Sequence, residues 1–461
     1  MTRRRKQAAT DSRPLADLSG LRIIIANWRD PWHPEAGGAE RYAWEMACAL
    51  VAHGAQVRFV TARGTGQSRG EQRDGVEIVR LGGRLTVYPM VLAWLLAHRG
   101  WADAVLDCHC GIPFFTPVVL PRRVPVLCLV HHVHTDQFGM FFPAWMAWIG
   151  QFLEGPMSRV VYWRQGCVSV SPSTMKAMRE RLHWNGDIYL VPNGTPPPAR
   201  SPEARAQARE GDGALTAPED LTRLVWIGRL VAHKRAELIV PVAARGFTIE
   251  VVGRGPGAAT LAAASEAVPG LTGEIHLHGF LDDEAKEDLV SRSLLQLSTS
   301  SHEGWGLTVV EAAALGVPTV AYDVVGIRDA VLDGETGWLV KEGEELADVV
   351  DRAAKELADP ARREAVAAAC RAWAASLSWE RSTTRMTELI GASVRSGTSR
   401  GARMGAWVLA TAGGPEVIAE GPVLDVLLDG GGTVNRQATP IERLLGEVQG
   451  LAETANSTQE P

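Results

Sequence analysis

Two glutamates, Glu303 and Glu311, stand eight positions apart around a glycine-containing turn in STSSHEGWGLTVVEAAALGVP (298–318). Glu303 follows a predicted strand, and Glu311 falls roughly 10 Å along a helix expected to begin near Leu307. A carboxylate near a helix N-terminus gains from the helix dipole and can accept two ribose hydroxyls. The spacing therefore suits a nucleotide that carries a sugar along the mouth of a parallel sheet. The alternative is a pair of solvated glutamates.

Two cations five positions apart, Arg229 and Lys234, follow another predicted strand in IGRLVAHKR. A guanidinium offers a planar fork of donors and an ammonium offers a point charge, so the pair could clamp a pyrophosphate beside a helix N-terminus. Positive charge at this place would also stabilise a departing diphosphate, a task that a metal ion performs elsewhere. The alternative is that both are ordinary surface charges.

Glycines after two further predicted strands could let the backbone approach a ligand closely. Gly37 and Gly38 precede a predicted helix in GGAERYAWEMACAL, where free N–H groups favour a phosphate or a hydroxyl-rich group. Gly253 lies in VVGRGPG, a poor dinucleotide fingerprint because Pro256 and Gly257 disturb the spacing of the third glycine. That loop suits a backbone that passes near a sugar or a base.

Three histidines, His131, His132 and His134, lie where the apolar run VPVLCLV ends. A histidine at a strand end can accept a hydrogen bond from a hydroxyl or donate one to an oxygen. A purely structural role is the alternative for each of them. The residues alone do not choose among the three.

Composition narrows the class of protein. The 461 residues are 46% hydrophobic and 22% charged, as in globular proteins of two or three domains. The net charge of −6 argues against a general nucleic-acid binder. No apolar segment follows the basic start, and the six cysteines are scattered, which is typical of a reduced cytoplasmic protein. Cys108 and Cys110 lack a second pair of ligands, so no metal site is predicted.

Apolar runs alternate with amphipathic segments along the chain. LRIIIAN (21–27) and QVRFVTA (56–62) flank a helix, so the first sheet begins with parallel strands. A second half restarts the same alternation with LTRLVWIGRL after a stretch rich in Pro, Ala and charge. The sequence therefore predicts an α/β protein of two facing Rossmann-like domains, with ligands bound in the cleft between them.

The predicted division of the chain has six parts. They are a disordered basic tail (1–19), a first Rossmann-like domain (20–195), a linker (196–220), a second Rossmann-like domain (221–375), a helix (376–392) and a short C-terminal extension (393–461). The extension contains the strand-like runs AWVLA and VLDVLL and a helical stretch near 440–449, and its role is open.

The longest uncharged run, QFGMFFPAWMAWIGQFL (137–153), is shorter than the roughly 20 residues that a spanning helix needs, and it contains Pro143. Its aromatic side chains suit an interfacial segment or a lip that faces an acceptor. The alternative is a segment packed inside the domain. Peripheral contact with the inner face of a membrane stays open.

Taken together, GGAERYAWEMACAL, LVHHVH, VPNG, IGRLVAHKR, VVGRGPG, EGWGLTVVEAAALGVPTVAYD, DGETGWLV and SWERS resemble the retaining glycosyltransferases of family 4 (glycosyl transferases group 1), which have the GT-B fold. The resemblance covers about residues 21–390. It is specific because the order and spacing of all the motifs agree, whereas no single motif would suffice.

The resemblance implies a role for each candidate residue. It assigns the donor diphosphate to Arg229 and Lys234, the ribose to Glu311, the donor sugar to Glu303 and the nucleotide loop to Gly253. It places the acceptor in the first domain, with Gly37 and Gly38 near the diphosphate. It identifies His131 as the histidine of the catalytic centre, with His132 as the alternative one position later.

The reaction implied is transfer of a sugar from a UDP- or GDP-sugar to an acceptor hydroxyl with retention, without a metal or a bound cofactor. The donor is a co-substrate. The acceptor is either a lipid-linked glycan or polysaccharide precursor, or a nucleoside or natural product. Two other hypotheses are a nucleotide-sugar epimerase of the GT-B fold and a binding protein without turnover. The EGWGLTVVEA and GRLVAHKR motifs favour the transferase.

Overall fold

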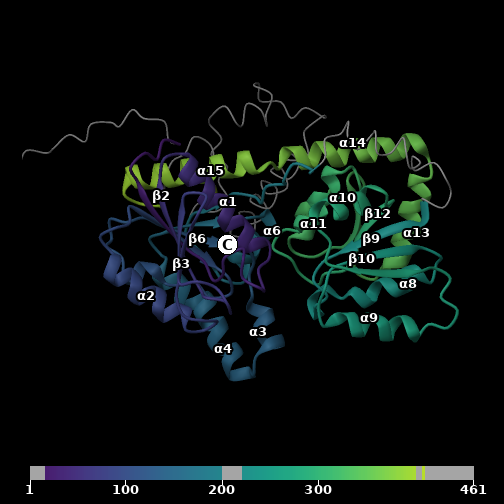
Figure 1. The fold of residues 1–461 in the computed structure, drawn as a ribbon, viewed down its shortest axis with the longest axis horizontal. Coiled ribbons are helices and arrows are strands. Elements are labelled where there is room, and N and C mark those ends of the chain that lie inside the picture. The colour runs from purple at the N-terminus through teal and green to yellow at the C-terminus, as the bar shows by residue number, and fades with distance from the viewer. Residues whose placement is uncertain (1–15, 200–220, 401–407, 411–461) are drawn as a thin grey trace, which may run out of the picture.

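The computed structural model describes residues 16–199, 221–400 and 408–410. Two α/β domains, each built on one mainly parallel sheet, stand side by side, and two long helices run along their upper edge (Figure 1). The predicted α/β architecture of two Rossmann-like domains is confirmed. Among the described helices, none is both long enough and apolar enough to cross a membrane.

The first sheet has nine strands in the order β15-β8-β7-β6-β5-β1-β2-β4-β3. Pairing is parallel from β8 to β4, and the two edge strands β15 and β3 are antiparallel. The strands are β1 (Arg22–Ala26), β2 (Gln56–Thr61), β3 (Gly70–Arg73), β4 (Val76–Arg80), β5 (Ala104–His109), β6 (Val126–Val130), β7 (Gly166–Ser169), β8 (Ile188–Leu190) and β15 (Val408–Ala410).

Strand β1 shows why this sheet needs helices on both faces. Its side chains alternate, so Ile23 and Ile25 pack with helix α1 while Ile24 packs on the opposite face with helix α2. Both faces are therefore apolar, as expected for a buried parallel strand. The helical segments of this domain are α1 (Gly38–Ala52), α2 (Val87–His98), η1 (Thr116–Val118), α3 (Thr135–Phe141), α4 (Ala144–Phe152), η2 (Leu153–Met157), α5 (Ser158–Val161) and α6 (Pro172–Glu180).

The second sheet has six parallel strands in the order β11-β10-β9-β12-β13-β14. They are β9 (Arg223–Ile227), β10 (Thr248–Val252), β11 (Ile275–Gly279), β12 (Leu295–Ser298), β13 (Thr319–Tyr322) and β14 (Gly337–Val340). The helical segments are η4 (Ala232–Lys234), η5 (Ala236–Ile239), α8 (Val240–Ala243), α9 (Gly257–Glu266), α10 (Asp283–Ser291), α11 (Leu307–Ala314), α12 (Ile327–Ala330), α13 (Leu346–Leu357), α14 (Pro360–Ser376) and α15 (Trp379–Ser396).

Helix α15 crosses from the second domain back to the first. It follows α14 along the upper edge of the molecule and packs against α1 (Figure 1). Met386, Leu389 and Ile390 are buried in the same apolar cluster as the strands of the first sheet. The core of the first domain is therefore completed by residues that lie about 200 positions beyond its last parallel strand.

Several predicted elements are confirmed, and some are wrong in detail. The helix expected to begin near Leu307 begins at Leu307 and ends at Ala314, and Ser171 accepts a hydrogen bond from the Thr174 amide as the N-cap of α6. In the predicted alternation of the second half, the segment after β9 is a 3-10 turn followed by the single turn α8 in place of a full helix. Strand β3 was not predicted because its sequence, GEQR, is polar and exposed.

The C-terminal helix and the first strand-like run of the extension are also present, as α15 and β15. Most of the basic tail, most of the linker, the run VLDVLL and the helical stretch near 440–449 lie outside the described residues.

Truncating Leu389 should destabilise the first domain although this residue follows the second domain in sequence. We expect Leu389→Ala to lower the free energy of unfolding by about 2–5 kcal/mol, because it leaves a cavity under a fully buried side chain. Urea denaturation monitored by fluorescence measures the loss. Glu380→Gln, exposed on the same helix, is the matched control, and an equal effect of both changes would contradict the packing described.

Candidate functional site

The carboxyl ends of the two sheets meet so closely that glycine is required at the seam. A methyl group on Gly38, at the start of α1, would lie 2.6 Å from Cδ1 of Leu307, at the start of α11. A methyl group on Gly304 would lie 2.8 Å from the carbonyl oxygen of His131. The predicted glycine pair, the histidine strand end and the EGWG turn therefore lie at one interface between the domains.

Lys234 and Glu303 form an ion pair inside this interface. The Nζ of Lys234 donates a hydrogen bond to Oε1 of Glu303, and both side chains are about four-fifths shielded from solvent. Ser300 Oγ donates to the same carboxylate oxygen at 2.8 Å. The turn after β12 and the 3-10 turn η4 after β9 thus bring together two residues that the sequence places 69 positions apart.

Glu303 remains ionised because it is paired. Burial alone would raise the pKa of this carboxyl, but the charge and hydrogen bond of Lys234, together with Ser300, outweigh it and hold the pKa below its usual value. A buried carboxylate of this kind can accept hydrogen bonds from sugar hydroxyls.

Glu311 lies on the second turn of α11, as predicted, and two cations that were not predicted contact it. Arg41 of α1 approaches Oε1 at 3.7 Å from the first domain, and Lys286 of α10 donates to Oε2 at 3.3 Å. Arg41 directly follows the GGAE motif, so its place beside the glycine pair was visible in the sequence. The contact of Lys286 depends on how α10 packs against α11, which no local pattern reports.

Arg229 differs from Lys234 in its partners. Within the described residues its guanidinium has no carboxylate partner, and its Nη2 lies 4.0 Å from where a Cβ on Gly37 would be. Within the described residues, Lys234 is therefore already paired with a carboxylate, whereas the Arg229 guanidinium is available to bind a ligand. Gly253 has a φ of 144°, and a Cβ there would collide with the carbonyl oxygen of Gly228, the residue before Arg229.

The three histidines after β6 are shielded and neutral. Burial lowers the pKa of His131 to about 3, with His132 and His109 adding to the effect, and burial also lowers the pKa of His132. His131 packs edge-on against Tyr42 with ring centroids 5.2 Å apart, and its Nε2 has no hydrogen-bond partner among the described residues. A neutral ring offers one donor nitrogen and one acceptor nitrogen.

His132 and His134 face the second domain. Their rings are tilted against each other with centroids 3.8 Å apart, and the ring of His302, next to Glu303, lies 6.5 Å from that of His132. His233, next to Lys234, stacks on His302 at 5.2 Å. The structure thus adds His233 and His302 to the candidate site. Their positions beside Lys234 and Glu303 were the available signal.

A contact that the sequence did not predict joins the domains directly. Asp329 of α12 accepts hydrogen bonds from the amide and the hydroxyl of Ser173, in the first turn of α6. The same hydroxyl accepts a hydrogen bond from the Gly326 amide at 2.9 Å. Asp329 is only 5% exposed, so its carboxylate depends on these donors from the other domain.

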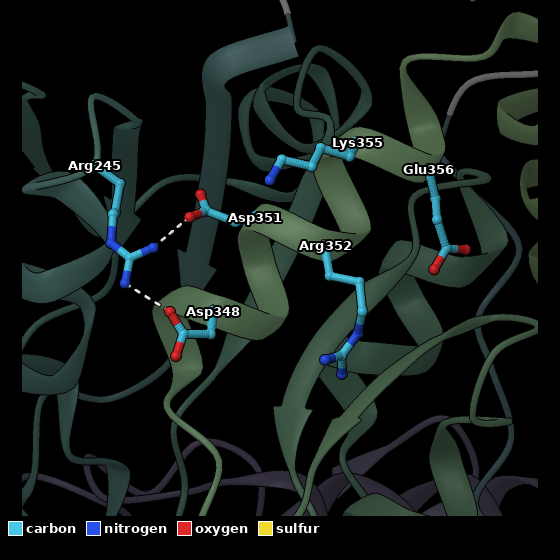
Figure 2. Close-up of a pocket in the computed structure, with 6 residues that line it drawn as sticks. All are labelled: Arg245, Asp348, Asp351, Arg352, Lys355 and Glu356. Atoms are coloured by element: carbon cyan, nitrogen blue, oxygen red, sulfur yellow. Dashed lines mark hydrogen bonds and ion pairs between the residues drawn. The ribbon is translucent and has the colours of Figure 1, made fainter.

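Two surface cavities lie away from this interface. One of about 480 Å³ is lined mainly by charged residues of α13, and there Arg245 already pairs with Asp348 at 2.6 Å and with Asp351 (Figure 2). The other, of about 220 Å³, is lined by residues near Pro121 and Trp163 in the first domain. None of the predicted site residues lines either cavity.

The fold and the site together define a class of protein. Two mainly parallel α/β domains that meet at the loops after their strands, with cations and carboxylates on the loops after the second sheet, are the arrangement of the GT-B glycosyltransferases. Sucrose-phosphate synthase from Thermosynechococcus elongatus has the same fold, with a TM-score of 0.66 and 22% identity over 80% of this chain and 98% of its own.

The structure of HepE from Anabaena in complex with UDP-glucose also superposes, with a TM-score of 0.60 and 16% identity over 80% of this chain and 98% of that one. The family model "Glycosyl transferases group 1" matches residues 209–373, and "Glycosyltransferase Family 4" matches residues 36–197. The chain belongs to this glycosyltransferase family and is a glycosyltransferase of the GT-B type.

Among curated relatives, the D-inositol 3-phosphate glycosyltransferase of Xylanimonas cellulosilytica is 27% identical over 397 residues. The match covers 78% of this chain and 92% of that protein.

Because burial keeps these histidines neutral in the folded protein, we expect acid to destabilise it. The pKa of His131 is lowered from 6.5 to about 3, so between these values the unfolded chain binds a proton that the folded chain does not. Stability is therefore greatest above pH 6.5 and falls as the pH is lowered, by about 2 kcal/mol for this residue between about pH 6.5 and pH 5.

Replacing His131 by Asn should reduce the slope of the free energy of unfolding against pH by the amount that corresponds to one bound proton. Urea denaturation of both proteins at pH values on each side of that range gives the two slopes, whose difference is insensitive to any uniform loss of stability in the variant. Parallel slopes would show that His131 is not held neutral by burial.

Proposed function

We propose that this glycosyltransferase moves a sugar from a UDP- or GDP-sugar to an acceptor hydroxyl with retention of configuration. The observation that carries the proposal is the paired Lys234 and Glu303 beside Arg229, which has no carboxylate partner among the described residues, at the seam where the glycine-led helix α1 meets α11. In this proposal the two cations bind the diphosphate, and the carboxylate beside them accepts hydrogen bonds from the sugar hydroxyls.

In the proposed complex the diphosphate lies near Gly37 and Gly38, between Arg229 and Lys234. Lys234 has three donors, so it can contact a phosphate oxygen while it keeps its hydrogen bond to Glu303. Arg229 supplies a charge that no carboxylate of the described part of the chain neutralises. Glu311 would accept the ribose hydroxyls in competition with Arg41 and Lys286.

The proposed step is substitution on one face of the sugar. The bond from the anomeric carbon to the diphosphate oxygen breaks, and a bond to the acceptor oxygen forms on the same face. The acceptor proton passes to the departing diphosphate, whose negative charge Arg229 and Lys234 stabilise. His131, or His132 one position later, would remain neutral and would hydrogen-bond a sugar hydroxyl near the reacting carbon.

The known relatives support particular substrates. HepE, whose structure contains UDP-glucose, favours a uridine diphosphate donor as the first to test. The relatives named D-inositol 3-phosphate glycosyltransferase favour a hydroxyl of a small phosphorylated polyol as the acceptor. A lipid-linked glycan or a natural product stays as an alternative acceptor. The donor is a co-substrate, and we propose no further cofactor.

Thermal denaturation in the presence of UDP, GDP, dTDP and ADP is the first experiment, because the base that stabilises the fold identifies the donor. The matching nucleotide sugars are then incubated with the purified protein. Hydrolysed or transferred sugar supports the transferase, whereas an isomerised donor supports an epimerase. Tight binding without turnover would support a nucleotide-sugar-binding protein.

Substitutions of Arg229 and Lys234 test whether these cations bind the diphosphate. We expect Arg229→Met and Lys234→Met each to weaken nucleoside diphosphate binding about 10-fold to 100-fold, because each loses a charged hydrogen bond. Titration calorimetry measures the change. Lys355→Met, at an exposed cation of α13 in the cavity of Figure 2, is the matched control and should bind normally.

We expect Glu303→Ala to lower turnover about a hundredfold, because the donor sugar loses the carboxylate that orients it. Steady-state kinetics with the donor found above measure the effect. Near-normal kinetics for both Glu303→Ala and Lys234→Met would show that the site lies elsewhere.

A further inference from the structure

Large exposed apolar side chains are concentrated in one segment of the first domain. Six of the thirteen that the described residues expose lie within residues 145–163, on α4, α5 and the turn after α5. We call this group the aromatic surface, which consists of Trp145, Trp148, Ile149, Phe152, Val160 and Trp163. Helices α3 and α4 project from the lower edge of the domain (Figure 1).

Helix α4 buries its small residues and exposes its large ones. Ala147 and Gly150 face inward, and a methyl group on Gly150 would lie 2.6 Å from the ring of Phe138. Trp145 and Trp148 are 66% and 63% exposed. The run 137–153 is therefore not simply packed inside the domain. Because exposing tryptophan to water is unfavourable, this orientation indicates an apolar medium outside the protein.

The charged residues that line the cavity beside Trp163 are basic although the whole chain carries −6. Arg164 lies over the ring of Trp163 at 5.3 Å, and Arg122 lines the same cavity as both of them. Arg123 is exposed and Arg159 is half-buried. The one acidic residue within 145–163, Glu154, is fully buried and accepts hydrogen bonds from the amide of His134 and the hydroxyl of Thr135.

We propose that the aromatic surface docks this enzyme onto an anionic lipid bilayer, with α4 lying in the plane of the interface. Tryptophan rings prefer the level of the lipid headgroups, and arginines beside them are attracted to anionic lipids. A second copy of this chain fits less well, because a two-fold contact through this surface would bring the arginines of both copies together.

Docking in this way would hold the site next to the membrane. Helix α3 begins at Thr135, directly after His131, His132 and His134 of the candidate site, and leads to α4. The proposal goes beyond the proposed transfer reaction, since every residue of the aromatic surface lies outside the donor site. Lipid binding can therefore be tested without any substrate.

Co-sedimentation of the full chain with vesicles tests the proposal. We expect binding to vesicles of equal parts phosphatidylcholine and phosphatidylglycerol, and at least about tenfold weaker binding to phosphatidylcholine alone. Raising the salt from about 0.1 M to about 1 M should weaken binding to the anionic vesicles, because screening removes the arginine contribution. Absence of binding to the anionic vesicles would overturn the proposal.

Variants identify the surface that binds. The double change Trp145→Ser and Trp148→Ser, and separately Arg123→Glu with Arg164→Glu, should each reduce binding to anionic vesicles about tenfold or more. The matched control is Phe280→Ser, at a side chain 72% exposed in the second domain, and it should bind like the unmodified protein. Equal binding by all these proteins would overturn the proposal.

Two further measurements distinguish lipid docking from damage to the nucleotide site and from association of the chain with itself. Thermal stabilisation by UDP or GDP should be the same in the tryptophan variant as in the unmodified protein, so loss of lipid binding with normal nucleotide binding supports docking. Sedimentation equilibrium reports association of the chain with itself. A dimer that the tryptophan changes dissociate, in a protein that does not bind vesicles, would assign the surface to a second copy instead.

Discussion

The hydrogen bonds between Asp329 and Ser173 fix how the two domains meet. A carboxylate that is almost fully buried must find donors, and here the donors come from the first turn of a helix in the other domain. The helix N-terminus adds a favourable dipole for the negative charge. These bonds hold the first turn of α6 against α12. The close approach of Gly304 to His131 lies at the same interface.

At this interface, burial acts in opposite directions on different groups. It keeps His131 and His132 neutral, because the imidazolium form loses its hydration and gains no carboxylate hydrogen bond. It would also neutralise Glu303, but the Lys234 ammonium prevents this. The result is a set of neutral hydrogen-bonding rings beside an ionised carboxylate and the Arg229 cation, which pairs with no carboxylate that the structure describes. Such a set suits a ligand that combines hydroxyls with a negative charge.

Helix α15 ties the two domains together at the other side. Its apolar residues complete the core of the first domain, and the amide of Thr195 donates to the carbonyl of Leu377 just before the helix begins. The chain therefore passes between the domains twice, once near Thr195 and once near Leu377. The aromatic surface lies on the helices after β6, so the same strand end leads to both the histidines and the exposed tryptophans.

The sequence by itself determined the apolar strands, the order of the two α/β halves and the position of Glu311 on its helix, because apolar periodicity and glycine placement are local properties. It also placed the candidate residues after strands, where parallel sheets bind ligands. Only the tertiary structure decided which of these residues touch. The pairing of Lys234 with Glu303, the approach of Arg41 and Lys286 to Glu311, and the contact of Ser173 with Asp329 join segments 25 to 270 residues apart. Such contacts depend on how helices pack and how domains meet, and neither leaves a periodic pattern in the chain.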